Sequence, residues 1–209
     1  MNDSDGDGIQ DGTEFGLTLF DVILGSSSLL FNYEVLYTDI DFFQPDIDPS
    51  TITDPLGQDS DGDGVSDADE DRNGDGSSIN QYETDAANVD TDGDGLWDGF
   101  TIGDHIGEAS IGTYPLDMDS DDAGRLAGYN ITLNGISYIG EYGWLNPTDI
   151  YSDNDGLQDG TELGRYYNAL NPTADNILMD WEISGINGTD ISIFISDADP
   201  DTTTNPGDP

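Results

Sequence analysis

The chain of 209 residues contains no cysteine, one histidine and only three lysine or arginine residues. Without cysteine it forms no disulfide and offers no thiolate to a metal. The 46 acidic residues give a formal net charge of −43, which excludes nucleic acid as a partner because binding its phosphates needs a basic surface. No hydrophobic run is long enough to span a bilayer, so we expect no direct membrane insertion.

The residues needed for common catalytic mechanisms are also scarce. His105, the single histidine, stands in a glycine-rich stretch, and no serine lies in a nucleophile-elbow motif. Carboxylate pairs are so numerous that spacing cannot single out a glycosidase pair. We therefore expect no enzymatic activity. Met1 is followed at once by acidic residues rather than by a basic and apolar leader, so we expect a removed signal peptide or a segment of a longer chain.

The sequence does contain acidic, glycine-rich loops at residues 3–14, 59–83, 90–98, 117–128 and 149–162. The clearest loop runs from Asp59 to Glu70, with aspartate at its positions 1, 3 and 5. Ca²⁺ prefers about six to eight oxygen ligands, and alternate aspartates place three carboxylates around one centre. Glycine at position 6 turns the carbonyl of position 7 inward. The acid at position 9 binds the ion through water, and the acid at position 12 closes the ligand shell. The predicted ligands are Asp59, Asp61, Asp63, the Val65 carbonyl, Asp67 and Glu70.

Three further loops follow this pattern, and their apolar residue at position 7 is expected to point into the core. The first loop has the predicted ligands Asp3, Asp5, Asp7, the Ile9 carbonyl, Asp11 and Glu14. The second has Asp90, Asp92, Asp94, the Leu96 carbonyl and Asp98, with Thr101 at position 12 and Asp104 or Glu108 as a substitute. The third has Asp153, Asp155, the Leu157 carbonyl, Asp159 and Glu162, with Tyr151 at position 1 and Asp149 as a substitute.

Two stretches carry the pattern in degenerate form. Residues 71–83 have one residue inserted before the closing acid, and the predicted ligands are Asp71, Asn73, Asp75 and Glu83. The stretch that begins at Asp119 and Asp121 has Ala123 at position 5 and Ala127 at position 9, so it is the weaker candidate and contributes no predicted ligand. Acidic loops also occur as solvated linkers. The recurrence of the glycine, the apolar residue and the aspartate at fixed positions disfavours that interpretation.

Between the loops lie runs of β-branched and aromatic residues at 17–37, 129–142 and 177–195, which predict three β-hairpins. Turn sequences such as Asn134-Gly135 support them. We therefore predict a single calcium-dependent domain over residues 1–209 that is mostly β and irregular. In it, calcium-stapled loops alternate with hairpins that pack into a small sandwich-like core. Helix is limited to short turns, for instance at 67–70 and 161–166, and residues 202–209 form a linker-like tail.

The units D-x-D-G-D-G-[IVL]-x-D, followed by Gly-Thr-Glu-x-Gly, resemble thrombospondin type 3 repeats of bacterial and archaeal surface proteins. The linking sequences Thr53-Asp54-Pro55-Leu56 and Leu145-Asn146-Pro147-Thr148 share this resemblance, which covers about half of the chain. It implies repeats that wrap around many calcium ions with little regular secondary structure. The repeats here are more widely spaced than the close tandem of that family, which disfavours a simple rod-like stalk.

The resulting hypothesis is an extracellular or cell-surface calcium-binding structural protein, a repeat unit of an adhesin, matrix or filament. Its folding would depend on several Ca²⁺ ions. Millimolar external calcium would fill their binding sites, whereas submicromolar cytosolic calcium would leave them empty. Hairpin edges would accept strands from other copies of the chain. Two alternatives are a calcium-dependent carbohydrate-recognition module, with glycans bound beside Trp97 or Trp144, and an accessory segment of a secreted hydrolase.

Overall fold

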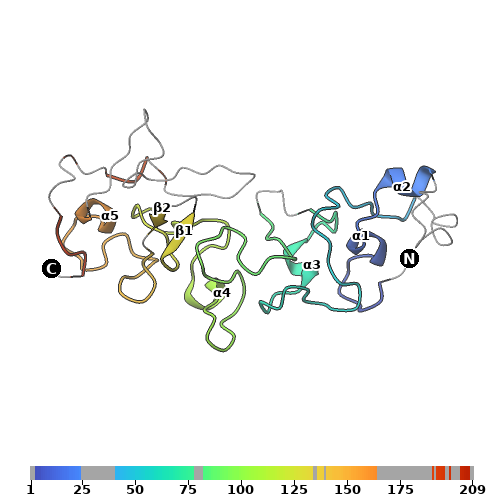
Figure 1. Cartoon of the computed structure of the whole chain (residues 1–209), viewed down its shortest axis with the longest axis horizontal. Coiled ribbons are helices and arrows are strands. Elements are labelled where there is room, and N and C mark those ends of the chain that lie inside the picture. Colours follow the sequence, from blue (N-terminus) through green and yellow to red (C-terminus); the bar gives the residue numbers. More distant parts are fainter. Residues whose placement is uncertain are drawn as a thin grey trace. The chain divides into compact units, whose positions relative to one another are not determined.

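The computed structural model describes residues 3–24, 41–77, 82–133, 136–138, 140–163, 190, 192–195, 198 and 203–207. Most of this chain is irregular loop (Figure 1). The chain divides into two compact units, Met1–Val89 and Asp90–Pro209, where the sequence led us to expect one domain. Within the described residues, no helix combines the length and the apolar character needed to cross a membrane. The elements are α1 (Asp11–Glu14), α2 (Leu19–Leu24), α3 (Asp67–Glu70), α4 (Glu108–Ile111), β1 (Ile131–Leu133), β2 (Ile136–Tyr138) and α5 (Asp159–Glu162).

Helices α1, α3 and α5 are single turns that begin at position 9 of a loop and end at position 12. Each therefore presents the closing acid of its loop from the end of a helical turn. The turn predicted at 67–70 is confirmed as α3, whose first residues are capped by the Ser66 side chain. The turn predicted from residue 161 begins two residues earlier, at Asp159.

Helix α2 corrects part of the predicted hairpin at 17–37, because residues Leu19–Leu24 are helical rather than extended. Thr18 and Asp21 cap this helix reciprocally. The Thr18 N–H and hydroxyl donate to Asp21 Oδ2 at 3.1 and 2.6 Å, and the Asp21 N–H donates to Thr18 Oγ1 at 3.3 Å. This arrangement is a capping box with aspartate as the acid. Residues 25–40 lie outside the described part of the chain, as does most of the hairpin predicted at 177–195.

Strands β1 and β2 pair antiparallel within the segment 129–142, which the sequence predicted as a hairpin. Ile131 lies opposite Tyr138, Thr132 opposite Ser137 and Leu133 opposite Ile136. A shorter excursion, residues 98–107, is closed by a bridge between Trp97 and Gly107. The β1–β2 hairpin and the segment 98–107 each follow an acidic loop, and the chain after each of them returns to that same loop.

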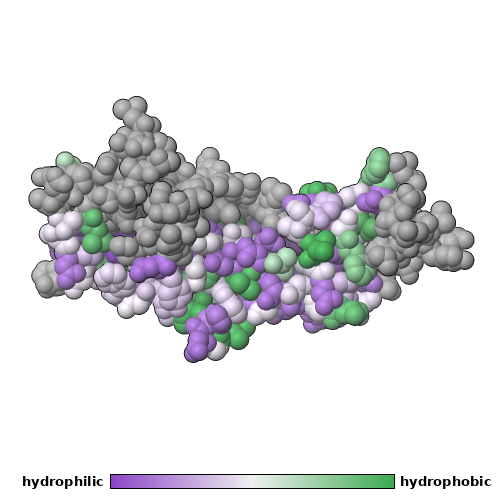
Figure 2. Space-filling model, in the orientation of Figure 1, coloured by the Kyte–Doolittle hydropathy of each residue, from purple (hydrophilic) through white to green (hydrophobic). Residues whose placement is uncertain are grey.

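The interior of the described chain is rich in acids rather than in apolar side chains. Eight of the ten largest fully buried side chains are carboxylates: Glu70, Glu108, Glu141, Asp46, Asp63, Asp67, Asp94 and Asp159. On the face seen in Figure 2, hydrophobic and hydrophilic residues are interspersed over the described surface. Burial of so much carboxylate is costly unless something compensates its charge.

The prediction that position 7 points into the core holds for Ile9 and Leu96, which are 4 % and 0 % exposed. It is wrong for Leu157, which is 46 % exposed. Val65 is half-buried. The apolar slot is therefore covered in some loops and open to solvent in others.

The loops at 3–14 and 151–162 each hold a distant segment with the same two side chains. Gln10 donates its Nε2 to Phe42 O at 3.1 Å and accepts at Oε1 from Gln44 N at 3.0 Å. Thr13 Oγ1 donates to Gln44 O at 2.6 Å. The equivalent bonds in the other loop join Gln158 and Thr161 to Ile193 and Ile195.

Within the tail predicted at 202–209, Thr204 is hydrogen-bonded to the end of the loop at 151–162. The Thr204 N–H donates to Glu162 O at 2.8 Å and its hydroxyl to Glu162 Oε1 at 2.5 Å. Thr53 N donates to Glu14 O in the same way, at 3.2 Å. The sequences 46–55 and 197–206 also share the pattern D-x-D-P-x-T-x-T-[DN]-P.

Candidate metal centres

All six acidic loops share one backbone signature, with a positive φ at positions 4 and 6. Position 4 is occupied by Gly6, Gly62, Gly74, Gly93, Asp122 and Asn154, and position 6 by Gly8, Gly64, Gly76, Gly95, Gly124 and Gly156. Glycine tolerates this left-handed region, and aspartate and asparagine tolerate it better than other residues. The two degenerate stretches therefore share both left-handed positions with the four clear ones.

In the loop 59–70, Asp61 and Asp63 each accept a backbone N–H with one oxygen, whereas Asp59 accepts from Gly62 N and Gly64 N with its two oxygens, at 2.8 and 3.2 Å. Asp61 Oδ1 accepts from Asp63 N at 3.1 Å, and Asp63 Oδ1 accepts from Val65 N at 2.7 Å. Asp61 Oδ2 is buried and has no hydrogen-bond partner among the described residues. Asp59, Asp61 and Asp63 offer oxygens within 4.8 Å of one another. Because Ca²⁺–oxygen distances are about 2.3–2.6 Å, three oxygens at this spacing can share one ion.

The loop 3–14 repeats this geometry and adds its closing acid. Asp3, Asp5 and Asp7 have oxygens within 4.8 Å of one another, and Asp7, Glu14 and Asp67 form a second such group. Glu14 is 2 % exposed, and neither of its oxygens bonds to any described residue. Burial, followed by the charges of Asp7 and Asp5, raises the pKa of Glu14 to about 8.

The carbonyl of position 7 is available in all four clear loops. In the described part of the chain, no N–H donates to the carbonyl of Ile9, Val65, Leu96 or Leu157. A carbonyl oxygen beside inward-turned carboxylates completes a donor set of hard oxygens, which is the set that Ca²⁺ prefers.

The aspartate at position 9 has a structural role that the sequence reasoning missed. Ser60, at position 2, donates its N–H and hydroxyl to the two carboxylate oxygens of Asp67 at 2.7 and 2.6 Å. The Ser60 hydroxyl also accepts from Asp54 N at 2.7 Å, which ties the linking sequence to the loop. The same clamp joins Ser4 to Asp11, Thr91 to Asp98 and Ser152 to Asp159. Position 9 thus closes the loop through position 2.

Of the two acids proposed to substitute for the closing acid of the loop at 90–98, Glu108 is buried and Asp104 is exposed. The excursion 98–107 returns the chain so that Glu108 N donates to Trp97 O at 2.7 Å, whereas Asp104 lies exposed at its tip. Glu108 is 0 % exposed, and neither of its oxygens makes a hydrogen bond of normal geometry with the described residues, although the Thr113 hydroxyl lies nearby. Asp90, Asp92 and Asp94 have oxygens within 4.8 Å of one another.

The close packing of buried carboxylates in this loop raises their pKa values. Burial, followed by the charges of Asp94 and Glu108, raises the pKa of Asp92 to about 10. Burial, followed by Asp94, raises the pKa of Glu108 to about 9. Acids held so far above their ordinary pKa need a cation to remain ionised at neutral pH.

The stretch 71–83 is organised around Asp71, which accepts from Asp75 N at 3.1 Å and from Gly76 N at 2.8 Å. Its closing Glu83 accepts from Asn73 N and Nδ2 at 3.1 and 2.9 Å. Sequence reasoning missed Asp46, which is 2 % exposed and close enough to this loop that a Cβ on Gly76 would lie 2.5 Å from Asp46 Oδ1. Burial, followed by neighbouring carboxylates, raises the pKa of Asp46 to about 6.

The loop at 151–162 is the most open. Asp155 is exposed, whereas Asp159 and Glu162 are buried. Asp153 Oδ1 accepts from Asp155 N at 2.9 Å, and its Oδ2 is buried with no bond from the described residues. Asp149, the proposed substitute for Tyr151, accepts from Tyr151 N at 3.3 Å.

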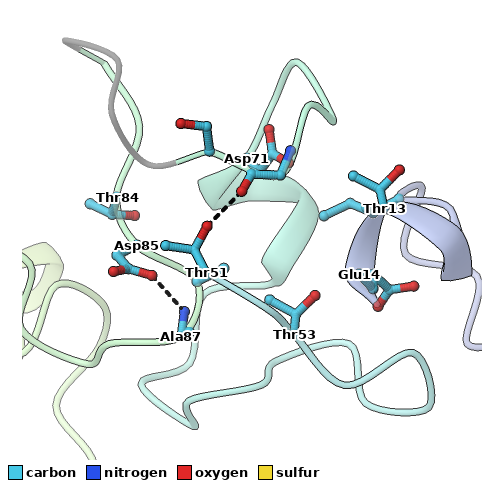
Figure 3. Close-up of a pocket in the computed structure, with 12 residues that line it drawn as sticks. Thr13, Glu14, Thr51, Thr53, Asp71, Thr84, Asp85 and Ala87 are labelled. Carbon is cyan, nitrogen blue, oxygen red and sulfur yellow. Dashed lines mark hydrogen bonds between the residues drawn. The ribbon is translucent and has the colours of Figure 1, made fainter. Parts of the chain in front are cut away.

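A small cavity of about 20 Å³ lies beside the first loops of unit Met1–Val89 (Figure 3). Threonines 13, 51, 53 and 84 line it together with the carboxylates of Glu14, Asp71 and Asp85. Thr51 Oγ1 donates to Gly76 O at 2.6 Å, and Ala87 N donates to Asp85 Oδ1 at 3.1 Å. This volume suits about one water molecule.

No protein-family model matches the sequence, and comparisons with curated proteins and with solved structures found no match.

Proposed function

We propose that this chain is an extracellular calcium-binding structural protein, a repeat unit of a surface adhesin, matrix or filament that folds around several Ca²⁺ ions. One observation carries the proposal: in the loops at 3–14, 59–70 and 90–98 carboxylate oxygens gather within 4.8 Å of one another, and several buried ones, such as both oxygens of Glu14 and Asp61 Oδ2, receive no hydrogen bond from the described residues. Ionised carboxylates cannot be buried side by side without a compensating cation. The resemblance to thrombospondin type 3 repeats agrees with this function.

Calcium fits this donor set better than magnesium. The loops offer several carboxylates and a carbonyl at flexible spacing, whereas Mg²⁺ demands near-octahedral geometry and retains several waters. Each site that binds only the folded chain adds about 2.7 kcal/mol of stability when free Ca²⁺ is about a hundredfold above its dissociation constant. A few such sites exceed the usual margin between a folded and an unfolded domain.

Thermal unfolding followed by circular dichroism tests this proposal in calcium-free buffer, in Ca²⁺ and in Mg²⁺ at equal ionic strength. We expect a large rise in Tm with Ca²⁺ and a much smaller one with Mg²⁺. Equal melting curves in the three buffers would refute the proposal, because the carboxylates would then be compensated without a specific ion.

Calcium-dependent carbohydrate binding is a second candidate, favoured by Trp144. This side chain is 68 % exposed and belongs to a shallow hollow with Ile111, Tyr142 and Pro147, three residues after the buried Glu141. Trp97 is less suited, because it stacks on His105 with a centroid distance of 4.2 Å. Glycan-array binding that is abolished by chelator and by Trp144→Ala would support this candidate, and binding that survives chelator would exclude it.

A further inference from the structure

The stretch that begins at Asp119 has the backbone of the loop at 90–98, although its sequence departs from the pattern. Gly124 N donates to Asp119 Oδ2 at 2.9 Å, as Gly95 N donates to Asp90 Oδ2 at 3.0 Å. Asp122, at position 4, has a φ of 60° and replaces the usual glycine. The substitutions in this stretch therefore remove ligands without changing the loop.

A second excursion returns an acid to this loop, as the first returns Glu108. The hairpin of β1 and β2 leads back so that Glu141 N donates to Leu126 O at 2.9 Å, at position 8 of the loop. Glu108 N donates to the same position of its own loop, Trp97 O, at 2.7 Å. The following residues repeat the match, with Tyr142 N bonded to Gly128 O and Ala109 N bonded to Gly99 O at 3.1 and 3.0 Å. Glu141 therefore stands where Glu108 stands.

The burial of the Glu141 carboxylate without a hydrogen-bond partner points to a ligand. It is 1 % exposed, and both of its carboxylate oxygens are buried without a hydrogen bond from any described residue. Arg125, which is 3 % exposed, directs its Nη2 to Gly140 O at 3.0 Å and lies 5.4 Å from the centre of the Trp144 ring. The guanidinium thus lies near Glu141 but leaves its oxygens without a donor.

We propose that Asp119, Asp121 and Glu141, with the carbonyl of Arg125 at position 7, hold one further calcium ion that the sequence pattern does not reveal. This inference rests on the proposed calcium-binding function. Three carboxylates and a nearby guanidinium attract a cation less strongly than the four carboxylates Asp90, Asp92, Asp94 and Glu108. We therefore expect this site to fill after the one at 90–98 as calcium rises.

Counting bound calcium by native mass spectrometry tests the proposal on the wild-type chain, on Glu141→Gln and on the matched control Glu108→Gln. We expect each variant to hold one ion fewer than the wild type at saturating Ca²⁺. An unchanged count for Glu141→Gln, with one ion lost in Glu108→Gln, would overturn this site and leave the proposed function intact. A wild type that binds no calcium would instead refute the proposed function.

Ala123→Asp provides a second test if Glu141→Gln perturbs the fold. Ala123 is 0 % exposed, as is Asp94 at the equivalent position 5 of the other loop. The added carboxylate should tighten one calcium-binding step about tenfold, because calcium affinity rises with the charge of the ligand set. Equilibrium dialysis measures the stepwise calcium affinities, and an unchanged set of affinities would overturn the proposal.

Discussion

Replacing Glu108 by glutamine preserves the size of a fully buried side chain and removes its charge. Burial and neighbouring carboxylates raise the pKa of Glu108 from 4.5 to about 9. Without a cation at pH 7, the folded chain must therefore keep this group protonated, at a cost of about 3 kcal/mol. Because the folded pKa is raised, this cost is absent below about pH 4.5 and grows as pH rises toward 9. The neutral glutamine of the Glu108→Gln variant has no such cost.

Calcium reverses the comparison. Each bound ion adds about 1.4 kcal/mol to the free energy of unfolding for every tenfold rise in Ca²⁺ above its dissociation constant. The Glu108→Gln chain lacks one ion, so we expect its stability to rise less steeply by about that amount. Urea unfolding at pH 7, over about 0.1–10 mM Ca²⁺, should give lines that cross, with the variant more stable at low calcium and less stable at high calcium.

Asp104→Asn is the matched control, because Asp104 is an exposed acid in the same excursion. Its line should run parallel to that of the wild type. Parallel lines for Glu108→Gln as well would refute the assignment of Glu108 as the closing acid of the loop at 90–98.

Three further predictions concern pH, the loop clamp and the left-handed positions. In calcium-free buffer, lowering the pH from 8 to 5 should make the circular-dichroism spectrum more like that of the calcium-bound chain, because burial raises the pKa of Glu14 to about 8 and the penalty for burying it fades toward pH 4.5; an unchanged spectrum would contradict this. Ser60→Ala should lower the free energy of urea unfolding by about 1.5–3 kcal/mol by removing a hydrogen bond to the Asp67 carboxylate, while Ser60→Thr should retain it; equal losses would exclude the clamp. Gly62 has a φ of 86°, so Gly62→Ala should lower the free energy of urea unfolding by about 1–2 kcal/mol. Gly62→Asn should lower it less, because Asn154 occupies the equivalent position; equal losses in the two variants would exclude a cost from the left-handed backbone.

The local parts of the site could be predicted from the sequence. Alternate aspartates such as Asp59, Asp61 and Asp63 act within a few residues of one another, so their spacing specifies their geometry. The helix α2 also had a local signal, the pair Thr18 and Asp21, which the apolar run beside it obscured.

The non-local parts could not be predicted, because they depend on where an excursion returns the chain. Backbone bonds across excursions of ten residues or more bring Glu108 and Glu141 to their loops. A signal was present in the repeated Ile-Gly-Glu at 106–108 and 139–141. The glycine of each is required, because a Cβ at Gly107 or Gly140 would lie 2.3 or 2.0 Å from a backbone oxygen.

Sedimentation velocity in calcium-free buffer, in millimolar Ca²⁺ and in Mg²⁺ tests the central claim of calcium-coupled folding most directly. The proposed function predicts a slow, expanded monomer without calcium that becomes compact in Ca²⁺ but not in Mg²⁺. A further increase in mass with Ca²⁺ would identify a subunit that assembles with other copies. The same sedimentation coefficient in all three buffers would contradict the proposal, because the carboxylate loops would then lie on a chain that folds without the ion.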